Sequence, residues 1–267
     1  MQTELMPRRA PESYSTQTSN LDRSSLGDVR DRLINESFAD PDEGLDPDDP
    51  IDRRFAEAEA HAELRRRGES WIKFLGPRAP RYRECRFTDF QIDGEKAENK
   101  RTALAKAHEY AVTLDARVRE RNNLLLYGPV GAGKDHLGVA VVRFGVWCRG
   151  AKARWINGQE LFGDFRDAMD DVRGRSEADA IRALAAVELL LLSDPLPAAG
   201  ELTDFQCNIL YRLAEARYCA GRPTIVSINV SDGGEARRRM GAATWDRLCH
   251  GAWCVPCFWS SYRHTAN

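Results

Sequence analysis

Several features that define other classes of protein are missing from this sequence. No run of about 18 apolar residues occurs, so we expect no membrane-spanning helix. The first residues hold no basic stretch followed by an apolar core, so we expect no signal peptide and a cytoplasmic protein. The seven cysteines are scattered and odd in number, which indicates a reducing compartment and not a disulfide-bonded fold.

The pattern of a structural zinc site is also missing. Cys254 and Cys257 form a short pair with Cys249 nearby, but the second cysteine pair that such a site needs is absent. On a strand, positions 254 and 257 would also face opposite sides. We therefore expect no zinc at these cysteines.

Charge is distributed unevenly along the 267 residues. Residues 1–50 hold 5 arginines and 12 acidic residues, a net charge of −7, so with −2 for the whole chain the other 217 residues carry +5. This first segment is rich in Ser, Thr, Pro and Asp and shows no helix or strand pattern, which predicts a disordered acidic tail over 1–50. A partner-binding tail is the alternative.

Two segments follow the tail. Apolar residues at helical spacing predict a helix over 52–75, and its last apolar residues, Trp71, Ile72, Phe74 and Leu75, are expected to dock on the main domain. Arginines at 78, 81, 83 and 86 mark a basic linker, with Phe87 and Phe90 as its anchors. We expect a helical extension with this linker over 51–80 and the main domain over 81–265.

The clearest motif is a glycine-rich loop between an apolar strand and a helix, with the P-loop spacing Gly-x-x-x-x-Gly-Lys. Its glycines allow backbone N–H groups to approach phosphates, and the start of the helix attracts anions. The lysine would reach the β- and γ-phosphates of ATP. The expected nucleotide contacts are Gly128, Pro129, Val130, Gly131, Ala132, Gly133, Lys134, Asp135 and His136.

The residue after Lys134 departs from the motif. A P-loop has Ser or Thr there, whose hydroxyl binds Mg²⁺, whereas this chain has Asp135. A carboxylate can hold Mg²⁺, but it adds negative charge beside an anionic nucleotide. The motif therefore predicts binding of ATP with Mg²⁺ and slow hydrolysis.

Strands alternate with helices along the main domain, and the apolar run Val187–Leu192 is typical of a strand buried on both faces of a parallel sheet. The alternation predicts an α/β fold with a parallel sheet flanked by helices. The expected strands are an apolar strand that opens the stretch 123–135 before the glycine loop, and 153–157, 187–192, 224–228 and 253–259. The expected helices are 96–120, 137–147, 159–169, 176–186 with Ser176 as its cap, and 203–219 with Thr203 as its cap.

Polar residues follow two of these strands, where a P-loop enzyme places its metal-binding and water-activating groups. Ser193 and Asp194 follow one strand, and Asn229 ends the next. Asp194 could hold Mg²⁺ or polarise water, with a plain strand-end turn as the alternative. Asn229 could position the attacking water. The candidate Mg²⁺ ligands are Asp135, Ser193 and Asp194.

Arginine suits contacts with the γ-phosphate, because it is always charged and forks onto phosphate oxygens. Arg247 and Arg263 are candidates, although from spacing alone each is more typical of a surface arginine. The basic clusters at 237–239 and at Lys152 and Arg154 form a modest nucleic-acid footprint, with solvated faces as the alternative.

Five of these pieces stand in the order found in the DnaC/IstB family of AAA+ ATPases, the helicase loaders and transposase helpers. The sequence resembles this family from about Arg81 to Arg263. The pieces that carry the resemblance are Leu124–Leu137, Val187–Asp194, Pro223–Asn229, Asp246–Leu248 and Trp259–Arg263.

The resemblance implies roles for individual residues. Asn229 matches the sensor-1 residue, Arg247 the arginine finger that reaches a neighbouring subunit, and Arg263 the sensor-2 arginine. Asp194 matches the position of the catalytic acidic residue. The helical lid of larger AAA+ proteins and the cysteine-bearing zinc module of the family are both missing from the sequence.

Two positions depart from the family pattern: Asp135 stands where the family has Thr, and Ser193 where it has the Mg²⁺-binding Asp. Two explanations stay open. A coupled exchange would keep one carboxylate and one hydroxyl near Mg²⁺, whereas decay of an unused catalytic site would not.

The resemblance also implies partners and an assembly. We expect a homo-oligomer that binds ATP between subunits and acts on single-stranded DNA with a replicative helicase or a transposase. A nucleotide-gated binding module without turnover is the alternative. A small-molecule P-loop kinase would need an arginine-rich lid and an acceptor pocket, and the sequence shows neither.

Overall fold

A computed structural model of the chain describes residues 50–170 and 176–262. The chain separates into two compact units, residues 1–59 and 60–267. Of the first unit, the description covers the beginning of helix α2 (Pro50–Leu75). The expected tail over 1–50 lies outside the described residues except for Pro50, and the domain limits at 50 and 80 stay predictions.

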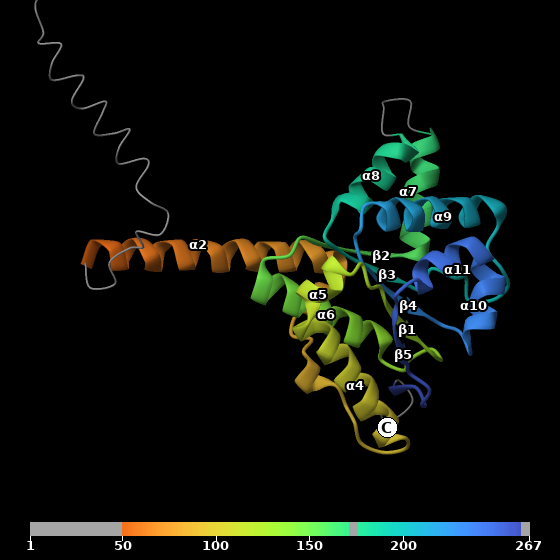
Figure 1. Cartoon of the computed structure of the whole chain (residues 1–267), viewed down its shortest axis with the longest axis horizontal. Coiled ribbons are helices and arrows are strands. Elements are labelled where there is room, and N and C mark those ends of the chain that lie inside the picture. Colours follow the sequence, from red (N-terminus) through yellow and green to blue (C-terminus); the bar gives the residue numbers. More distant parts are fainter. Residues whose placement is uncertain (1–49, 171–175, 263–267) are drawn as a thin grey trace, which may run out of the picture. The chain divides into compact units, whose positions relative to one another are not determined.

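The described residues contain one sheet of five parallel strands (Figure 1). The strands are β1 (Leu124–Tyr127), β2 (Ala153–Asn157), β3 (Leu189–Ser193), β4 (Thr224–Ile228) and β5 (Trp253–Pro256). Their order in the sheet is β2-β3-β4-β1-β5, and every pairing is parallel. All carboxyl ends therefore meet at one edge, where open α/β sheets bind their ligands.

The strand predictions hold with two changes of limit. β2 and β4 have the expected bounds, and β1 lies directly before the glycine loop, as expected. β3 begins at Leu189 and not at Val187, because Val187 is the C-cap of the preceding helix. β5 ends at Pro256 and not at Trp259. Its proline is tolerated because β5 is an edge strand of the sheet.

Helices precede and connect the strands. They are α2, α3 (Ala79–Tyr82), α4 (Ala97–Val112), α5 (Leu114–Arg119), α6 (Lys134–Arg149), α7 (Gly158–Asp170), α8 (Glu177–Ala186), α9 (Asp204–Cys219), α10 (Gly233–Met240) and α11 (Ala242–Cys249), with short 3-10 turns η1 (Gly76–Arg78) and η2 (Phe87–Asp89). Both predicted caps are confirmed, since Ser176 accepts a hydrogen bond from Asp179 N and Thr203 accepts one from Gln206 N. No helix in the described ranges is both long enough and apolar enough to cross a membrane.

The single helix expected over 96–120 is wrong, because the chain forms two helices that break at Thr113. The Thr113 hydroxyl donates to the Glu109 carbonyl at 2.6 Å, a local bond that competes with the helical ladder. The next residue, Leu114, is fully buried. The break thus turns Leu114 into the core.

The core lies on both faces of the sheet. Side chains that alternate along the strands point to opposite faces: Leu124, Leu126 and Leu191 pack with α4 and α6, whereas Leu125 and Leu190 pack with α7, α8, α9 and α11. Figure 1 shows these two groups of helices on opposite sides of the strands. Burial on both faces explains the continuous apolar run of β3.

The segment before the main sheet is folded where the sequence suggested a plain linker. Trp71, Phe74 and Leu75 at the end of α2 are buried in the core, as expected, whereas Ile72 is exposed. The expected basic linker forms η1 and α3. Phe90 is buried and Phe87 packs against the same core, so both predicted anchors are confirmed.

Candidate functional site

The glycine loop leaves the carboxyl end of β1 and enters α6 with backbone angles that favour glycine. Gly128, Gly131 and Gly133 all have positive φ, of 148°, 81° and 83°. A side chain would also collide with a neighbour, with the Cys257 carbonyl at Gly128 and with Ser261 at Gly131. The loop therefore keeps its shape and its bare backbone only with glycine at these positions.

Lys134, the first residue of α6, connects the glycine loop to the residue that follows β4, the strand beside β1 in the sheet. Its side chain is buried, with 4% of the residue exposed. Nζ donates to the carbonyls of Gly128 at 2.9 Å and Pro129 at 2.7 Å, and to Oδ1 of Asn229 at 2.7 Å. All three acceptors of the lysine ammonium are oxygen atoms, and phosphate oxygens could accept the same hydrogen bonds.

Asn229 continues this chain of polar contacts to a third strand. Its amide nitrogen donates to Oδ1 of Asp194 at 2.5 Å. Lys134, Asn229 and Asp194 follow β1, β4 and β3, which are neighbours in the sheet. Three of the predicted site residues thus form one hydrogen-bonded row at the carboxyl edge.

The backbone of Asp194 is in the left-handed region, with φ of 44°. This region costs an L-residue about 1–2 kcal/mol, less for Asp than for most other residues. The turn is held by the Asp194 amide, which donates to the Ser227 carbonyl at 3.0 Å. Strained positions of this kind gather at functional sites, but Asp also adopts this region in ordinary turns, so both interpretations of Asp194 stay open.

Asp135 and Ser193 have different partners. Asp135 Oδ1 accepts from the Ser227 hydroxyl at 2.5 Å. The Ser193 hydroxyl accepts from Nε1 of Trp155 at 2.8 Å and is buried. Asp135 lines the cavity described below and Ser193 does not, so the Ser193 hydroxyl lies behind the cavity wall.

Sequence reasoning missed Ser227 and Trp155. Ser227 is fully buried on β4 and opposite Ser193 in the register, so it stands between the two departing positions. The available signal was a hydroxyl between apolar neighbours, Val226 and Ile228, in a buried strand. Trp155 gave no such signal, because its contact with Ser193 depends on the pairing of β2 with β3.

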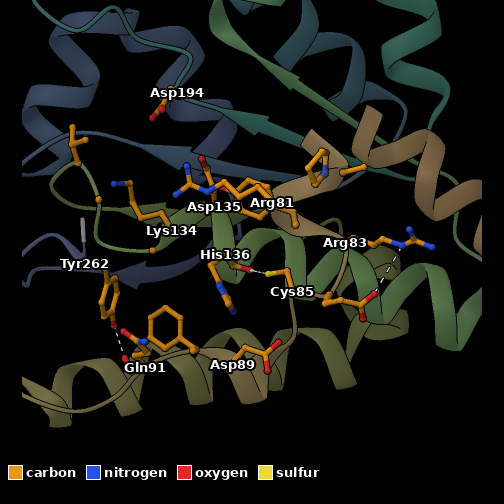
Figure 2. Close-up of a pocket in the computed structure, with 18 of the residues that line it drawn as sticks. Arg81, Arg83, Cys85, Asp89, Gln91, Lys134, Asp135, His136, Asp194 and Tyr262 are labelled. Carbon is orange, nitrogen blue, oxygen red and sulfur yellow. Dashed lines mark hydrogen bonds and ion pairs between the residues drawn. The ribbon is translucent and has the colours of Figure 1, made fainter. Parts of the chain in front are cut away.

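A cavity of about 970 Å³ opens at this edge of the sheet (Figure 2). One wall consists of the glycine loop and the start of α6, with Asp194 and Asn229 beside them. The opposite wall comes from the segment 79–91 and from Tyr262. The cavity is larger than one phosphate group needs and falls in the range of small-molecule sites.

The second wall is ordered by rings and by contacts to backbone. Phe90 meets His136 and Tyr262 edge-on at ring distances of 5.6 and 5.8 Å. Tyr262 donates to the Gln91 carbonyl at 2.5 Å, and Cys85 donates to the His136 carbonyl at 3.4 Å, as drawn in Figure 2. Burial raises the pKa of Cys85 and of Tyr262 to about 12, so both groups stay neutral at neutral pH.

Of the two predicted arginines, the one that the structure describes, Arg247, is not part of this cavity. Arg247 pairs with Glu215 and lies over the ring of Tyr211 at 4.8 Å. Asn123, just before β1, donates to the backbone carbonyl of Arg247 at 3.3 Å, which places Arg247 at the amino edge of the sheet. Arg263 lies outside the described residues. Within the described ranges, no cluster of three or more His, Cys, Asp or Glu side chains is arranged to hold a metal ion.

Known proteins share both sequence and fold with this chain. A family model described as IstB-like ATP binding protein matches residues 100–267. A protein of Mycobacterium tuberculosis, named as an ATP-binding protein in an insertion sequence, is 32% identical over 107 residues, which are 40% of each chain. The match thus spans less than half the length of that relative.

Solved structures share the fold. The DnaC helicase loader matches with a TM-score of 0.58 at 17% identity, over 66% of this chain and 98% of the loader. The replication initiator DnaA bound to AMPPCP and single-stranded DNA matches with a TM-score of 0.53 at 18% identity, over 70% of this chain and 52% of DnaA. These structures show an AAA+ type of P-loop fold, and with the family model, which covers more than half of the chain, they establish that this protein belongs to the IstB-like ATP-binding family of DnaC/IstB-type AAA+ proteins.

Proposed function

We propose that the protein binds ATP with Mg²⁺ in this cavity and uses the bound state to act on DNA with a protein partner. The observation that carries the proposal is the row of Lys134, Asn229 and Asp194 across three strands beside the glycine loop. The row brings a cation, an amide and a carboxylate to one edge, which are the groups that phosphate transfer needs.

The loop supplies the contacts for the phosphates. The loop and the first turn of α6 line the cavity, and the helix dipole favours an anion there. Lys134 would exchange its contacts with the Gly128 and Pro129 carbonyls for phosphate oxygens. Because this exchange replaces oxygen by oxygen, the lysine needs no new kind of partner.

The opposite wall suits a flat base. Phe90 and Tyr262 present rings, and the nearby carbonyls of Arg86 and Gln91 already hold His136 and Tyr262 in place. An adenine could lie between this wall and the start of α6.

Two carboxylates on the same cavity, Asp135 and Asp194, fit Mg²⁺, since this ion prefers oxygen ligands and keeps several waters. When bound, the ion would neutralise charge on the phosphates. Asn229 would orient a water, and Asp194 would accept its proton. Asp135 adds negative charge beside the phosphates, so we expect slow turnover.

Relatives guide the choice of partner. The similarity to an insertion-sequence protein rests on 32% sequence identity, whereas the likeness to a helicase loader rests on fold at 17% identity. We therefore place a transposase before a replicative helicase as the partner. Binding of single-stranded DNA and assembly into a homo-oligomer belong to the same proposal.

The decisive experiment measures affinity for a fluorescent ATP analogue. Lys134→Ala should weaken binding about 100-fold, since the lysine is a main charge-assisted partner of the phosphates. Lys152→Ala is the matched control, because Lys152 is exposed and lies outside the cavity. Equal affinity of wild type and Lys134→Ala would refute the ATP site.

A nucleotide-gated binding module without turnover is the second candidate. The position of Ser193 behind the cavity wall favours it, because the hydroxyl there cannot reach a metal without moving away from Trp155. Phosphate release with and without single-stranded DNA separates the two candidates. Release above the Lys134→Ala background supports an ATPase, and its absence supports the module.

A further inference from the structure

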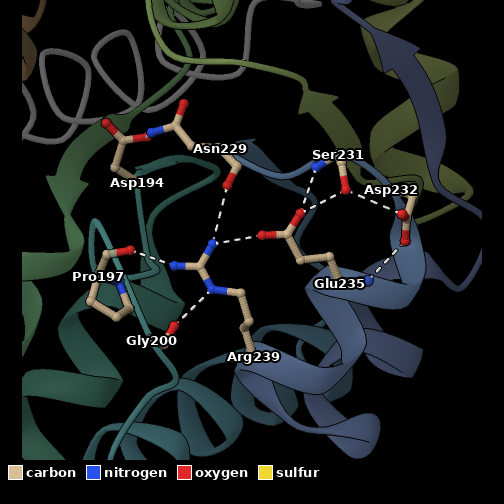
Figure 3. A network of polar contacts seen from close by, with 8 residues as sticks. All are labelled: Asp194, Pro197, Gly200, Asn229, Ser231, Asp232, Glu235 and Arg239. Carbon is tan, nitrogen blue, oxygen red and sulfur yellow. Dashed lines mark hydrogen bonds and ion pairs between the residues drawn. The ribbon is translucent and has the colours of Figure 1, made fainter.

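The three consecutive arginines at the end of α10 differ in how much of each is exposed to solvent. The sequence suggests one basic cluster over 237–239, but Arg237 and Arg238 are exposed, whereas the Arg239 side chain is only 13% exposed. Arg239 is therefore not part of a surface patch. Its guanidinium points into the protein, toward the edge of the sheet that holds the cavity (Figure 3).

The Arg239 guanidinium joins two loops. Nε donates to the Gly200 carbonyl at 2.8 Å and Nη2 to the Pro197 carbonyl at 2.5 Å, both in the loop after β3. Nη1 donates to the backbone carbonyl of Asn229 at 3.4 Å, directly after β4. One planar fork thus ties together the segments that leave two neighbouring strands, with three nitrogens in a fixed spacing that a single ammonium does not reproduce.

The connection to α10 is itself fixed. Glu235 accepts from Nη1 of Arg239 at 3.0 Å. The other oxygen of Glu235 accepts from the amide and the hydroxyl of Ser231, each at 2.8 Å. Asp232 caps the helix by accepting from the Glu235 amide at 2.8 Å. The stretch from Asn229 to Arg239 is therefore closed on itself by hydrogen bonds, as Figure 3 shows.

The two loops that Arg239 holds carry the two residues that contact each other at the cavity. Asp194 begins the first loop and Asn229 begins the second, and their side chains are hydrogen-bonded. Asn229 also accepts from Lys134. A shift of either loop would therefore change the distance between the Asn229 amide and the end of a bound polyphosphate.

We propose that Arg239 is a positioning residue that sets Asn229 and Asp194 for recognition of the third phosphate. This inference rests on the proposed ATP binding. Arg239 touches no residue of the glycine loop and does not itself line the cavity. Its one contact with the lining is the backbone carbonyl of Asn229, so its effect would fall on the γ-phosphate, which the Asn229 amide would face. The α- and β-phosphates are held by the loop.

The test compares affinities for a non-hydrolysable ATP analogue and for ADP, each with Mg²⁺. In Arg239→Gln the ratio of ATP-analogue to ADP affinity should fall about tenfold, with ADP affinity unchanged within about twofold. Arg239→Lys keeps the charge but not the fork, so its ratio should fall by about threefold. Arg237→Gln, on the exposed side of the same helix, is the matched control and should keep the wild-type ratio.

The outcomes separate this inference from the proposed function. An unchanged ratio in Arg239→Gln, or equal weakening of both nucleotides, would overturn the role of Arg239 while the ATP site stands. Failure of the wild type to bind either nucleotide would refute the ATP site and this inference with it. Should Arg239→Gln not fold, Arg239→Lys takes its place, and an unchanged ratio there overturns the inference.

Discussion

The two edges of the sheet use their polar groups differently. At the carboxyl edge, Lys134, Asn229 and Asp194 bond to one another around a cavity. At the amino edge, Asn123 and Arg217 bond mainly to backbone: the Asn123 amide donates to the Leu248 carbonyl at 3.0 Å and accepts from the Thr224 amide at 2.8 Å. The polar atoms at the carboxyl edge are available to a ligand, whereas those at the amino edge hold segments of the chain together.

Arg217 is the clearest example of a polar side chain at the amino edge that holds segments of the chain together. It is 1% exposed and donates to the carbonyls of Leu184, Val187 and Pro223 and to the Thr224 hydroxyl. Burial lowers the pKa of its guanidinium to about 9, so it remains charged at neutral pH. The buried charge is matched by oxygens from α8, from β4 and from the chain before β3 and β4. Changes at this edge should therefore affect stability, and changes at the other edge should affect nucleotides.

The largest expected effect is on stability. Arg217→Met should destabilise the fold by about 3–5 kcal/mol, because it leaves several buried oxygens without a donor. Urea unfolding measures the loss, with Arg212→Met as the control. Arg212 lies on the same helix and pairs with Glu177, both partly exposed, so that change should cost less than about 1 kcal/mol. Equal losses in the two variants would remove the contrast between the edges.

Arg247 is expected to be an exception to this contrast. It lies at the amino edge of the sheet, but the family resemblance implies that it acts on the ATP of a neighbouring subunit. Arg247→Ala should lower turnover about 1,000-fold, the lower end of what an arginine finger contributes in P-loop enzymes. Mixing it with Lys134→Ala protein should restore part of the activity, because each variant supplies what the other lacks. The mixture is tested at protein concentrations at which the wild type assembles. If its turnover is no higher than that of each variant alone, Arg247 does not act on a neighbouring subunit.

The exchange of Asp135 and Ser193 predicts an effect of about tenfold, or 1.4 kcal/mol, on Mg²⁺-dependent ATP affinity. Asp135→Thr and Ser193→Asp should each weaken binding, and the double variant should regain it. Titration of the ATP analogue with and without Mg²⁺ measures the cycle. Additive losses would favour decay of the site, as would the buried contact of Ser193 with Trp155.

The smallest effect concerns the strained turn. Asp194→Gly should raise stability by about 0.5–1 kcal/mol, because glycine accepts positive φ at lower cost, and should lower turnover by removing the carboxylate. Asp194→Asn, which tolerates the same backbone angle, should lower turnover with stability unchanged. A loss of stability in Asp194→Gly would show that the Asn229 contact outweighs the strain.

The predictable parts of the molecule were those with local causes. The spacing of Gly128, Gly131 and Lys134 follows from what phosphates require, and the loop has the expected positive φ angles. The apolar residues of β1 and β4 marked these strands in the sequence because burial on both faces leaves a nearly continuous signal. Ser176 and Thr203 cap helices through contacts three residues away, within reach of sequence reasoning.

The missed parts depend on contacts between distant segments. Three arginines in a row look alike in sequence, and only the turn of the chain after β3 distinguishes Arg239 from Arg237. The role of Ser227 depends on its register opposite Ser193. The break at Thr113 depends on the burial of Leu114, which local helix propensity does not register.

The position of Arg247 at the edge opposite the glycine loop also constrains symmetry. If Arg247 completes the ATP site of a second copy, the contact joins two different surfaces and is heterologous. A twofold dimer, which joins identical surfaces, could not place both arginines at both nucleotides through that contact. Such subunits must assemble head to tail, into a closed ring or an open helical filament. An open assembly has, at one end, a nucleotide site without a neighbour's Arg247 and, at the other end, an Arg247 without a neighbour's nucleotide; a closed ring has neither.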